Sequence, residues 1–186
     1  MLKRTLLLFL TFILYIVLDQ YFFFPRFEVA SPHPFKGNRF YNPYKDIDFS
    51  HLLLANFHGH TKAWGGLTNG TGNSYSVKRR YDSLGYELPN LSQYQFLDKS
   101  THLNNSLDVY EHGINLNKTH QLVIGSNSVL WLDYVLPQPF NHKQHVLNLL
   151  AADTNNIIVI NHPHLRNGYS AEDVKRLREV TAAGML

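Results

Sequence analysis

The chain contains no cysteine, so disulfide bonds and thiolate metal ligands are excluded, and any metal ion must be held by imidazole and carboxylate groups. Such ligands suit zinc, manganese or iron. The excess of charge is also small, with a formal value of +3 when histidine is neutral. Because there is no stripe of basic residues either, we expect no nucleic-acid partner. The 11 histidines are the more informative feature, since several adjoin strand-like runs.

Charged residues make up only 17% of the chain and hydrophobic residues 44%, which is typical of a folded protein and not of a disordered one. The 186 residues are enough for one domain with a sizeable core. No internal repeat is found along the sequence.

An apolar run follows Lys3 and Arg4 at the N-terminus. It is almost unbroken over residues 5–18 and resumes, after two polar residues, with four aromatic residues that end at position 24. The 20 residues of 5–24 match the length of a transmembrane helix, so we predict a membrane anchor over residues 1–24. A cleaved signal peptide and a buried core helix are the alternatives. The two basic residues predict that the rest of the chain lies on the extracytoplasmic side, which in a bacterium is the periplasm.

Residues 25–50 are predicted to form a linker arm, because they are rich in proline and aromatic residues and show no clear period. We expect this arm to be ordered by packing of its aromatic side chains onto the domain that follows. Those side chains are Phe27, Phe35, Phe40, Tyr41 and Tyr44.

Strand-like and helix-like runs alternate over residues 51–186, which is typical of an α/β fold with mainly parallel strands. The predicted strands are 52–57, 86–91, 107–110, 121–124, 129–136 and 157–160, and residues 93–106 are predicted to be a loop. The predicted helices are 74–84, 141–152 with Asn141 as its cap, and 170–179, which begins with a Ser170–Asp173 capping box.

His58 and His60 directly follow the first predicted strand. Residues i and i+2 of a strand point to the same side, so the two imidazoles are expected to face one point. That point lies at the strand end where α/β barrels keep their active sites. Gly59 between them is expected to let the backbone approach a ligand. Alone, the pair is a weak signal, and two loop histidines bonded to backbone are the alternative.

Three more candidates stand next to predicted strands. Glu111 follows the strand 107–110, His120 precedes the strand 121–124, and His162 follows an apolar strand in an Asn-His-Pro motif. The ordinary alternatives are a solvated carboxylate for Glu111, a turn residue for His120 and, for the nearby His164, a surface side chain. One shared cluster explains the repeated placement of His and Glu after strands better than chance does.

The order of these motifs resembles the PHP (polymerase and histidinol phosphatase) family over about residues 52–178. The resemblance implies a partial, irregular (β/α)7 barrel behind the transmembrane helix, and hydrolysis of phosphate esters by divalent metal ions. It also implies that one or two Zn, Mn or Fe ions are held by His58, His60, Glu111, His120 and His162. Arg166 is a candidate phosphate contact, and a solvated loop arginine is the alternative.

The chain departs from the pattern of this family at three places. Gln93 and Tyr94 stand where the family usually has an acid and a metal-binding histidine. Residues 62–66 replace an acid that often follows His-x-His, and the closing Asp-x-His motif is not found before Leu186. The domain over residues 51–186 is therefore expected to be incomplete at its C-terminus.

Three functions remain open on this basis. The first is a membrane-anchored, metal-dependent phosphoesterase that acts on a small phosphorylated substrate, whether a nucleotide, a sugar phosphate or a lipid head group. The second is a metal-binding but catalytically impaired binding module, which the replacements at Gln93 and Tyr94 favour. The third is a structural, envelope-associated domain with incidental histidines.

Overall fold

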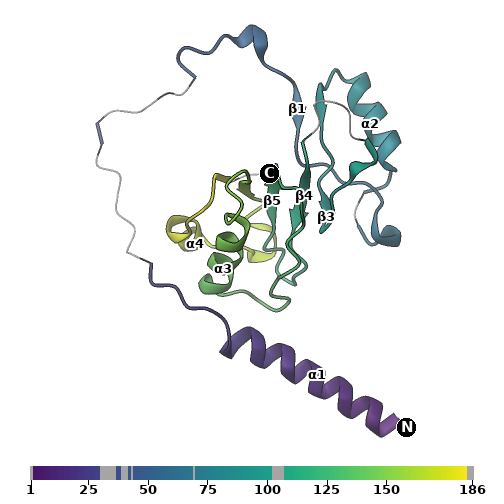
Figure 1. Cartoon of the computed structure of the whole chain (residues 1–186), viewed down its shortest axis with the longest axis vertical. Helices are drawn as coiled ribbons and strands as arrows, with labels where there is room; N and C mark the ends of the chain where they lie inside the picture. Colours follow the sequence, from purple (N-terminus) through teal and green to yellow (C-terminus); the bar gives the residue numbers. More distant parts are fainter. Residues whose placement is uncertain are drawn as a thin grey trace.

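The computed structural model describes residues 2–29, 37–38, 42, 44–68, 70–101 and 107–183 (Figure 1). The helices are α1 (Leu2–Phe22), α2 (Ser74–Ser83), α3 (Phe140–Leu150) and α4 (Ala171–Arg176). The strands are β1 (Ala55–Asn56), β2 (Leu88–Pro89), β3 (Gln93–Tyr94), β4 (Val109–His112), β5 (Gln121–Ile124), β6 (Ile157–Ile160) and β7 (Ala182–Ala183). Short 3-10 helices are η1 (Phe49–His51), η2 (Trp64–Gly66), η3 (Lys99–Thr101) and η4 (Leu165–Asn167).

The main sheet has the order β3-β4-β5-β6-β7, and β1 pairs with β2 in a separate sheet. The two longest pairings, β4 with β5 and β5 with β6, are antiparallel. The expectation of mainly parallel strands is therefore wrong for the centre of the sheet, although the shorter β1–β2, β3–β4 and β6–β7 pairings are parallel. The described strands form two open sheets, and the partial barrel implied by the resemblance remains a prediction.

Both faces of the central strands are covered. Tyr110 and Val123 on one face pack with Ile158 and with the apolar side of α3. Val109 and Leu122 belong to a second apolar cluster on the other face. Because side chains alternate along a strand, Glu111 shares the face of Val109, away from α3. This alternation places a carboxylate inside the sheet on the side where the histidine loops lie.

Helix α3 is held on the sheet by Val146, Leu147 and Leu150, which are spaced to share one side of a helix and are almost fully buried. Each such side chain contributes about 1.5–3 kcal/mol through removal from water. The predicted cap of this helix is wrong, because Pro139 occupies the N-cap position. The Asn141 side chain instead accepts a hydrogen bond of 2.8 Å from the backbone N–H of Phe27.

Several predicted elements are confirmed and others are wrong. The strands 121–124 and 157–160 occur as predicted, and the Ser170–Asp173 capping box begins α4. Residues 129–136 form no strand, whereas β3 lies inside the predicted loop 93–106. A short β7 also pairs with β6 at residues 182–183, within the C-terminal stretch where the sequence indicates no closing strand.

The last turn of α1 is joined to the domain by a side-chain amide. Gln20 Nε2 donates to the carbonyl of Leu136 at 3.0 Å, and Gln20 Oε1 accepts from the Leu136 N–H at 2.9 Å. Gln20 is thus buried, whereas the rest of the helix is largely exposed. Within the described residues, one helix, α1, is long and apolar enough to cross a membrane, with a mean hydropathy of 1.9. Figure 1 shows it leading away from the sheet.

The end of the anchor and the start of the linker arm both contact the domain. The ring centroids of Phe24 and His142 are 4.3 Å apart in an edge-on arrangement, and those of Phe27 and His145 are 6.1 Å apart. Tyr44 is exposed, so the expected packing fails for this residue. The predictions for Phe35, Phe40 and Tyr41 fall outside the described residues.

His142 is fully buried where α1 meets α3, and its ring stacks on Tyr134 at 4.0 Å. Neither ring nitrogen has a hydrogen-bond partner among the described residues. Burial lowers the pKa of His142 below its ordinary value of 6.5, because the charged form would lose its hydration in this aromatic surrounding. Protonation of His142 therefore opposes the folded state.

We predict that the folded state loses stability as the pH falls below about 6.5, because the unfolded chain binds a proton that the buried imidazole does not. The loss attributable to this residue should not exceed about 1.4 kcal/mol per pH unit. His142→Phe keeps an aromatic ring in place and should remove this part of the pH dependence. Thermal unfolding of the detergent-solubilised chain at about pH 7.5 and about pH 5.5 measures it.

The matched control is His51→Phe, since His51 is an exposed histidine in η1. This variant should keep the pH dependence of the unmodified chain. An unchanged pH dependence in His142→Phe would show that the buried imidazole does not control the stability.

Candidate metal centre

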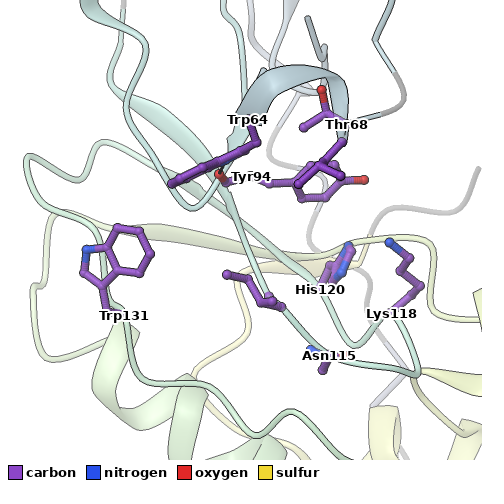
Figure 2. A pocket seen from close by; sticks show the side chains of 10 residues that line it. Trp64, Thr68, Tyr94, Asn115, Lys118, His120 and Trp131 are labelled. Atoms are coloured by element: carbon purple, nitrogen blue, oxygen red, sulfur yellow. Dashed lines mark hydrogen bonds between the residues drawn. The ribbon is translucent and has the colours of Figure 1, made fainter. Parts of the chain in front are cut away.

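A cavity and a cluster of histidines lie side by side and share His120. The cavity has a volume of about 390 Å³ and includes Trp64, Tyr94, Trp131 and His120 in its wall (Figure 2). The cluster surrounds Glu111 of β4. Every metal ligand predicted from the sequence belongs to this cluster.

His58 and His60 lie on the loop after β1, and β3 holds this loop in place. The backbone N–H of Ser92 donates to the Gly59 carbonyl at 2.9 Å, and the Thr61 N–H donates to Gln93 Oε1 at 3.1 Å. A Cβ at Gly59 would meet the Tyr81 hydroxyl at 3.1 Å, so any other residue would crowd α2 there. The expected approach of this backbone to a ligand stays a prediction.

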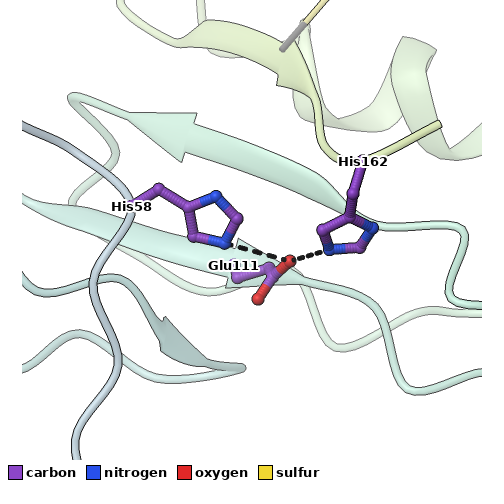
Figure 3. A group of neighbouring side chains, drawn as sticks. All are labelled: His58, Glu111 and His162. Atoms are coloured by element: carbon purple, nitrogen blue, oxygen red, sulfur yellow. Dashed lines mark hydrogen bonds and ion pairs between the residues drawn. The ribbon is translucent and has the colours of Figure 1, made fainter. Parts of the chain in front are cut away.

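The Glu111 carboxylate is the centre of the cluster and is 0% exposed. His120 Nδ1 and His162 Nε2 each lie 3.0 Å from its Oε1 atom, and His58 Nε2 lies 3.7 Å from the same atom. His60 Nε2 lies 2.9 Å from Oε2. Figure 3 shows His58 and His162 reaching the carboxylate from opposite sides. The structure therefore brings all five predicted residues together.

His120 reaches Glu111 because of a glycine. Gly113, just after β4, has a φ of 131°, and a Cβ at this position would lie 2.5 Å from Cδ2 of the His120 ring. Any other residue would therefore push the imidazole away from the carboxylate. The side chain of His120 is almost fully buried as a result.

His162 is held in an unusual backbone conformation after β6. Its φ is +28°, on the left-handed side that non-glycine residues rarely adopt, and it directly precedes Pro163. Such a conformation costs on the order of 1–3 kcal/mol and persists where the surroundings enforce it. The neighbouring Asn161 contributes to this, because its Nδ2 atom donates to Glu111 Oε1 at 3.0 Å and its N–H donates to the His120 carbonyl.

The charge of Glu111 is compensated by the imidazoles. Burial alone would raise the pKa of this carboxyl, but the facing His120, His162, His58 and His60 hold the pKa well below its ordinary value. Burial also lowers the pKa of His120, against the opposing effect of Glu111. The carboxylate therefore stays ionised, and the cluster offers one negative charge and several nitrogen donors.

Tyr94 and Gln93 lie at the cluster but do not add a ligand of the expected kind. The Tyr94 ring stacks on His60 with a centroid distance of 4.5 Å and meets the edge of His120 at 5.4 Å. Burial, followed by the charge of Glu111, raises the pKa of Tyr94, so its hydroxyl stays protonated. Gln93 holds the His60–Thr61 loop through the Thr61 backbone and side chain.

The donor set fits a divalent cation. One nitrogen each of His58 and His162 and one oxygen of Glu111 all lie within 4.8 Å of one another. Glu111 Oε2 accepts no hydrogen bond within the described part of the chain, although His60 Nε2 is 2.9 Å away. A lone pair on Glu111 Oε2 and one on His60 Nε2, both directed at a common ion and not at each other, would account for this geometry. Imidazole and carboxylate ligands suit Zn, Mn or Fe.

Arg166 is not brought to the cluster. It lies exposed on η4 with a φ of 49°, and it makes no hydrogen bond or ion pair with the residues that the structure describes. Sequence reasoning in turn missed Asn161 as a partner of Glu111, although it directly precedes the predicted His162. It also missed Lys118, whose position at the cavity depends on the turn between β4 and β5.

The chain was compared with protein-family models, with curated proteins and with solved structures, and none of the three comparisons found a match. The function of the cluster is therefore inferred from its geometry and from the chemistry of its donors.

We predict that the purified chain binds Zn, Mn or Fe at the cluster. Glu111→Gln should weaken binding by about 100-fold or more, because it removes the only charged ligand, and the His58→Ala/His60→Ala double variant should abolish it. Asn161→Ala removes a hydrogen bond to the carboxylate but no ligand, so it should cost about 10–100-fold. Isothermal titration with each metal measures these affinities.

His145→Ala provides the control, since His145 bonds to Tyr134 and lies outside the cluster. It should bind metal like the unmodified chain. Equal metal affinity in Glu111→Gln and the unmodified chain would exclude the cluster as the site.

Proposed function

We propose that this chain is a membrane-anchored, metal-dependent phosphoesterase with its centre at Glu111. The observation that carries the proposal is the fully buried carboxylate faced by four imidazoles from three separate segments of the chain. A structural carboxylate needs no such number of histidines, and most buried charges pair with one or two groups. The resemblance of the motif order to the PHP family supports the same activity.

The residues of the cluster have distinct roles in this proposal. His58, His60, Glu111, His120 and His162 hold one or two divalent ions. Such an ion supplies activation of a water molecule near neutral pH and stabilisation of charge on the phosphoryl oxygens.

Two further residues contribute to the site without binding an ion. Asn161 fixes the Glu111 carboxylate through its amide. Tyr94, whose raised pKa keeps its hydroxyl protonated, can donate a hydrogen bond to a phosphoryl oxygen but cannot act as a base at neutral pH.

A metal-binding module without catalysis is the second candidate, and Tyr94 is the observation that favours it. Its ring occupies the position beside His60 where the resemblance leads us to expect another imidazole ligand. A neutral phenol is a poor ligand by comparison, so the centre would hold fewer ions than a complete one. The two candidates predict the same metal binding and differ only in turnover.

We predict slow, metal-dependent hydrolysis of p-nitrophenyl phosphate or bis(p-nitrophenyl) phosphate by the full chain. Glu111→Gln should reduce the rate by at least about 100-fold, because the charge stabilisation that an ion provides is worth several kcal/mol. Release of p-nitrophenolate, with and without added Zn, Mn or Fe, measures the rate.

Two variants complete this experiment. Glu172→Gln alters an exposed carboxylate in the first turn of α4 and should leave the rate unchanged. Tyr94→His supplies the missing imidazole and should raise the metal content. Metal binding without hydrolysis of either ester, in the unmodified chain and in Tyr94→His, would favour the binding module.

The proposed location depends on α1, which has the length and hydropathy of a membrane span. We predict that the product fractionates with membranes and resists carbonate extraction, because an inserted helix is not released by alkali. Immunoblotting of the two fractions measures this. Recovery of a soluble product that begins near residue 31 would indicate a cleaved signal peptide instead.

A further inference from the structure

The cavity beside the cluster has aromatic walls. The indole rings of Trp64 and Trp131 are 6.3 Å apart and nearly perpendicular, and Trp64 Nε1 donates to the Tyr94 carbonyl at 2.7 Å. Figure 2 shows Trp64 and Tyr94 on one side of the space and Trp131 on another. The volume of about 390 Å³ is ample for an aromatic ring, since a cavity of about 150 Å³ already holds benzene.

These rings are unusually accessible for their size. Trp131 is 62% exposed and Trp64 is 45% exposed. Grouped exposed tryptophans on one concave surface are characteristic of ligand sites, because a bound group removes their faces from water. The cavity opens directly beside His120, so one ligand can fill the cavity and also reach the cluster.

Two polar side chains of the cavity wall, those of Thr68 and Asn115, already form hydrogen bonds within the protein. Thr68 Oγ1 accepts from the Ala63 N–H at 2.8 Å and donates to the Thr61 carbonyl at 2.7 Å. Asn115 Oδ1 accepts from the Thr119 N–H at 2.7 Å, and Asn115 Nδ2 donates to the Thr119 carbonyl at 3.0 Å. Hydroxyls of a sugar or the polar edge of a nucleobase would find these partners occupied, and burying them unpaired is costly.

Lys118 is a charged group of the cavity wall, and it stands where the cavity meets the cluster (Figure 2). Its ammonium lies 5.5 Å from the centre of the Tyr94 ring and forms no ion pair with a carboxylate of the described residues. The residue has a left-handed φ of 57°, and this turn between β4 and β5 sets the direction of its side chain. An unpaired ammonium at this boundary suits a phosphate oxygen.

We propose that the cavity binds the organic part of the phosphate ester, that this part is an aromatic ring, and that Lys118 contacts the phosphate. The inference rests on the phosphoesterase function proposed above and names its substrate class. The ring packs against Trp64 and Trp131, and the phosphate lies toward His120 and Lys118. Aryl and arylmethyl phosphates fit this arrangement, whereas sugar phosphates lack partners for their hydroxyls.

Binding of three phosphonates to the zinc-loaded full chain in detergent tests the inference. These compounds have a carbon–phosphorus bond in place of the ester bond and cannot be hydrolysed, so affinity is separated from turnover. Benzylphosphonate should bind about tenfold more tightly than methylphosphonate, through stacking and burial of its ring. Heptylphosphonate has as many carbon atoms as benzylphosphonate but should gain less, because its flexible chain loses more conformational freedom.

Variants assign the gain to the cavity. Trp131→Ala should remove most of the preference for benzylphosphonate and leave methylphosphonate unaffected. Lys118→Met should weaken both ligands by a similar factor of about tenfold. Tyr75→Ala, which removes an exposed aromatic ring from α2, is the matched control and should change neither affinity.

The outcomes separate this inference from the function on which it rests. Equal affinities for benzylphosphonate and methylphosphonate, or binding of neither, overturn the role of the cavity, while the p-nitrophenyl assays decide independently on hydrolysis. Heptylphosphonate that binds as tightly as benzylphosphonate, with the same dependence on Trp131, overturns the aromatic assignment in favour of a lipid chain. A chain that takes up none of Zn, Mn and Fe overturns the proposed function itself.

Discussion

The need to compensate one buried negative charge organises much of this domain. Glu111 lies inside the main sheet with no access to water, so its ionised form depends on the imidazoles and the Asn161 amide around it. That requirement explains features that are otherwise costly: the strained backbone of His162 and the glycine at 113 that admits the His120 ring. A centre that tolerates such costs is typical of function rather than of stability alone.

The sequence predicted elements best where hydrophobicity alone identifies them. Strands 121–124 and 157–160 are short apolar runs, and both occur as predicted. The run 129–136 is as apolar but forms no strand, because Tyr134 enters the core and the Leu136 backbone bonds to Gln20. Strand β3 was missed because its buried residues are polar and are satisfied by hydrogen bonds that only the tertiary structure reveals.

The candidate site was predicted more fully than the fold. His58, His60 and His162 follow strands, and Glu111 lies near the end of β4. His120 precedes β5, whose antiparallel pairing places its start beside the end of β4, so the convergence survived the error over parallel pairing. Asn161, Lys118 and the two tryptophans carry no local pattern. The role of Asn161 depends on the strand register, that of Lys118 on a left-handed turn, and those of the tryptophans on two loops that come together. Sequence spacing encodes none of these.

The antiparallel meander β4-β5-β6 has a consequence for how the centre assembles. It joins Glu111, His120 and His162 through two continuous ladders of four paired residues each. The His58–His60 loop belongs to the separate β1–β2 pair and is attached through β3 by a few hydrogen bonds. The few attachments of that loop make it the part of the centre that we expect to open first when the native protein unfolds locally.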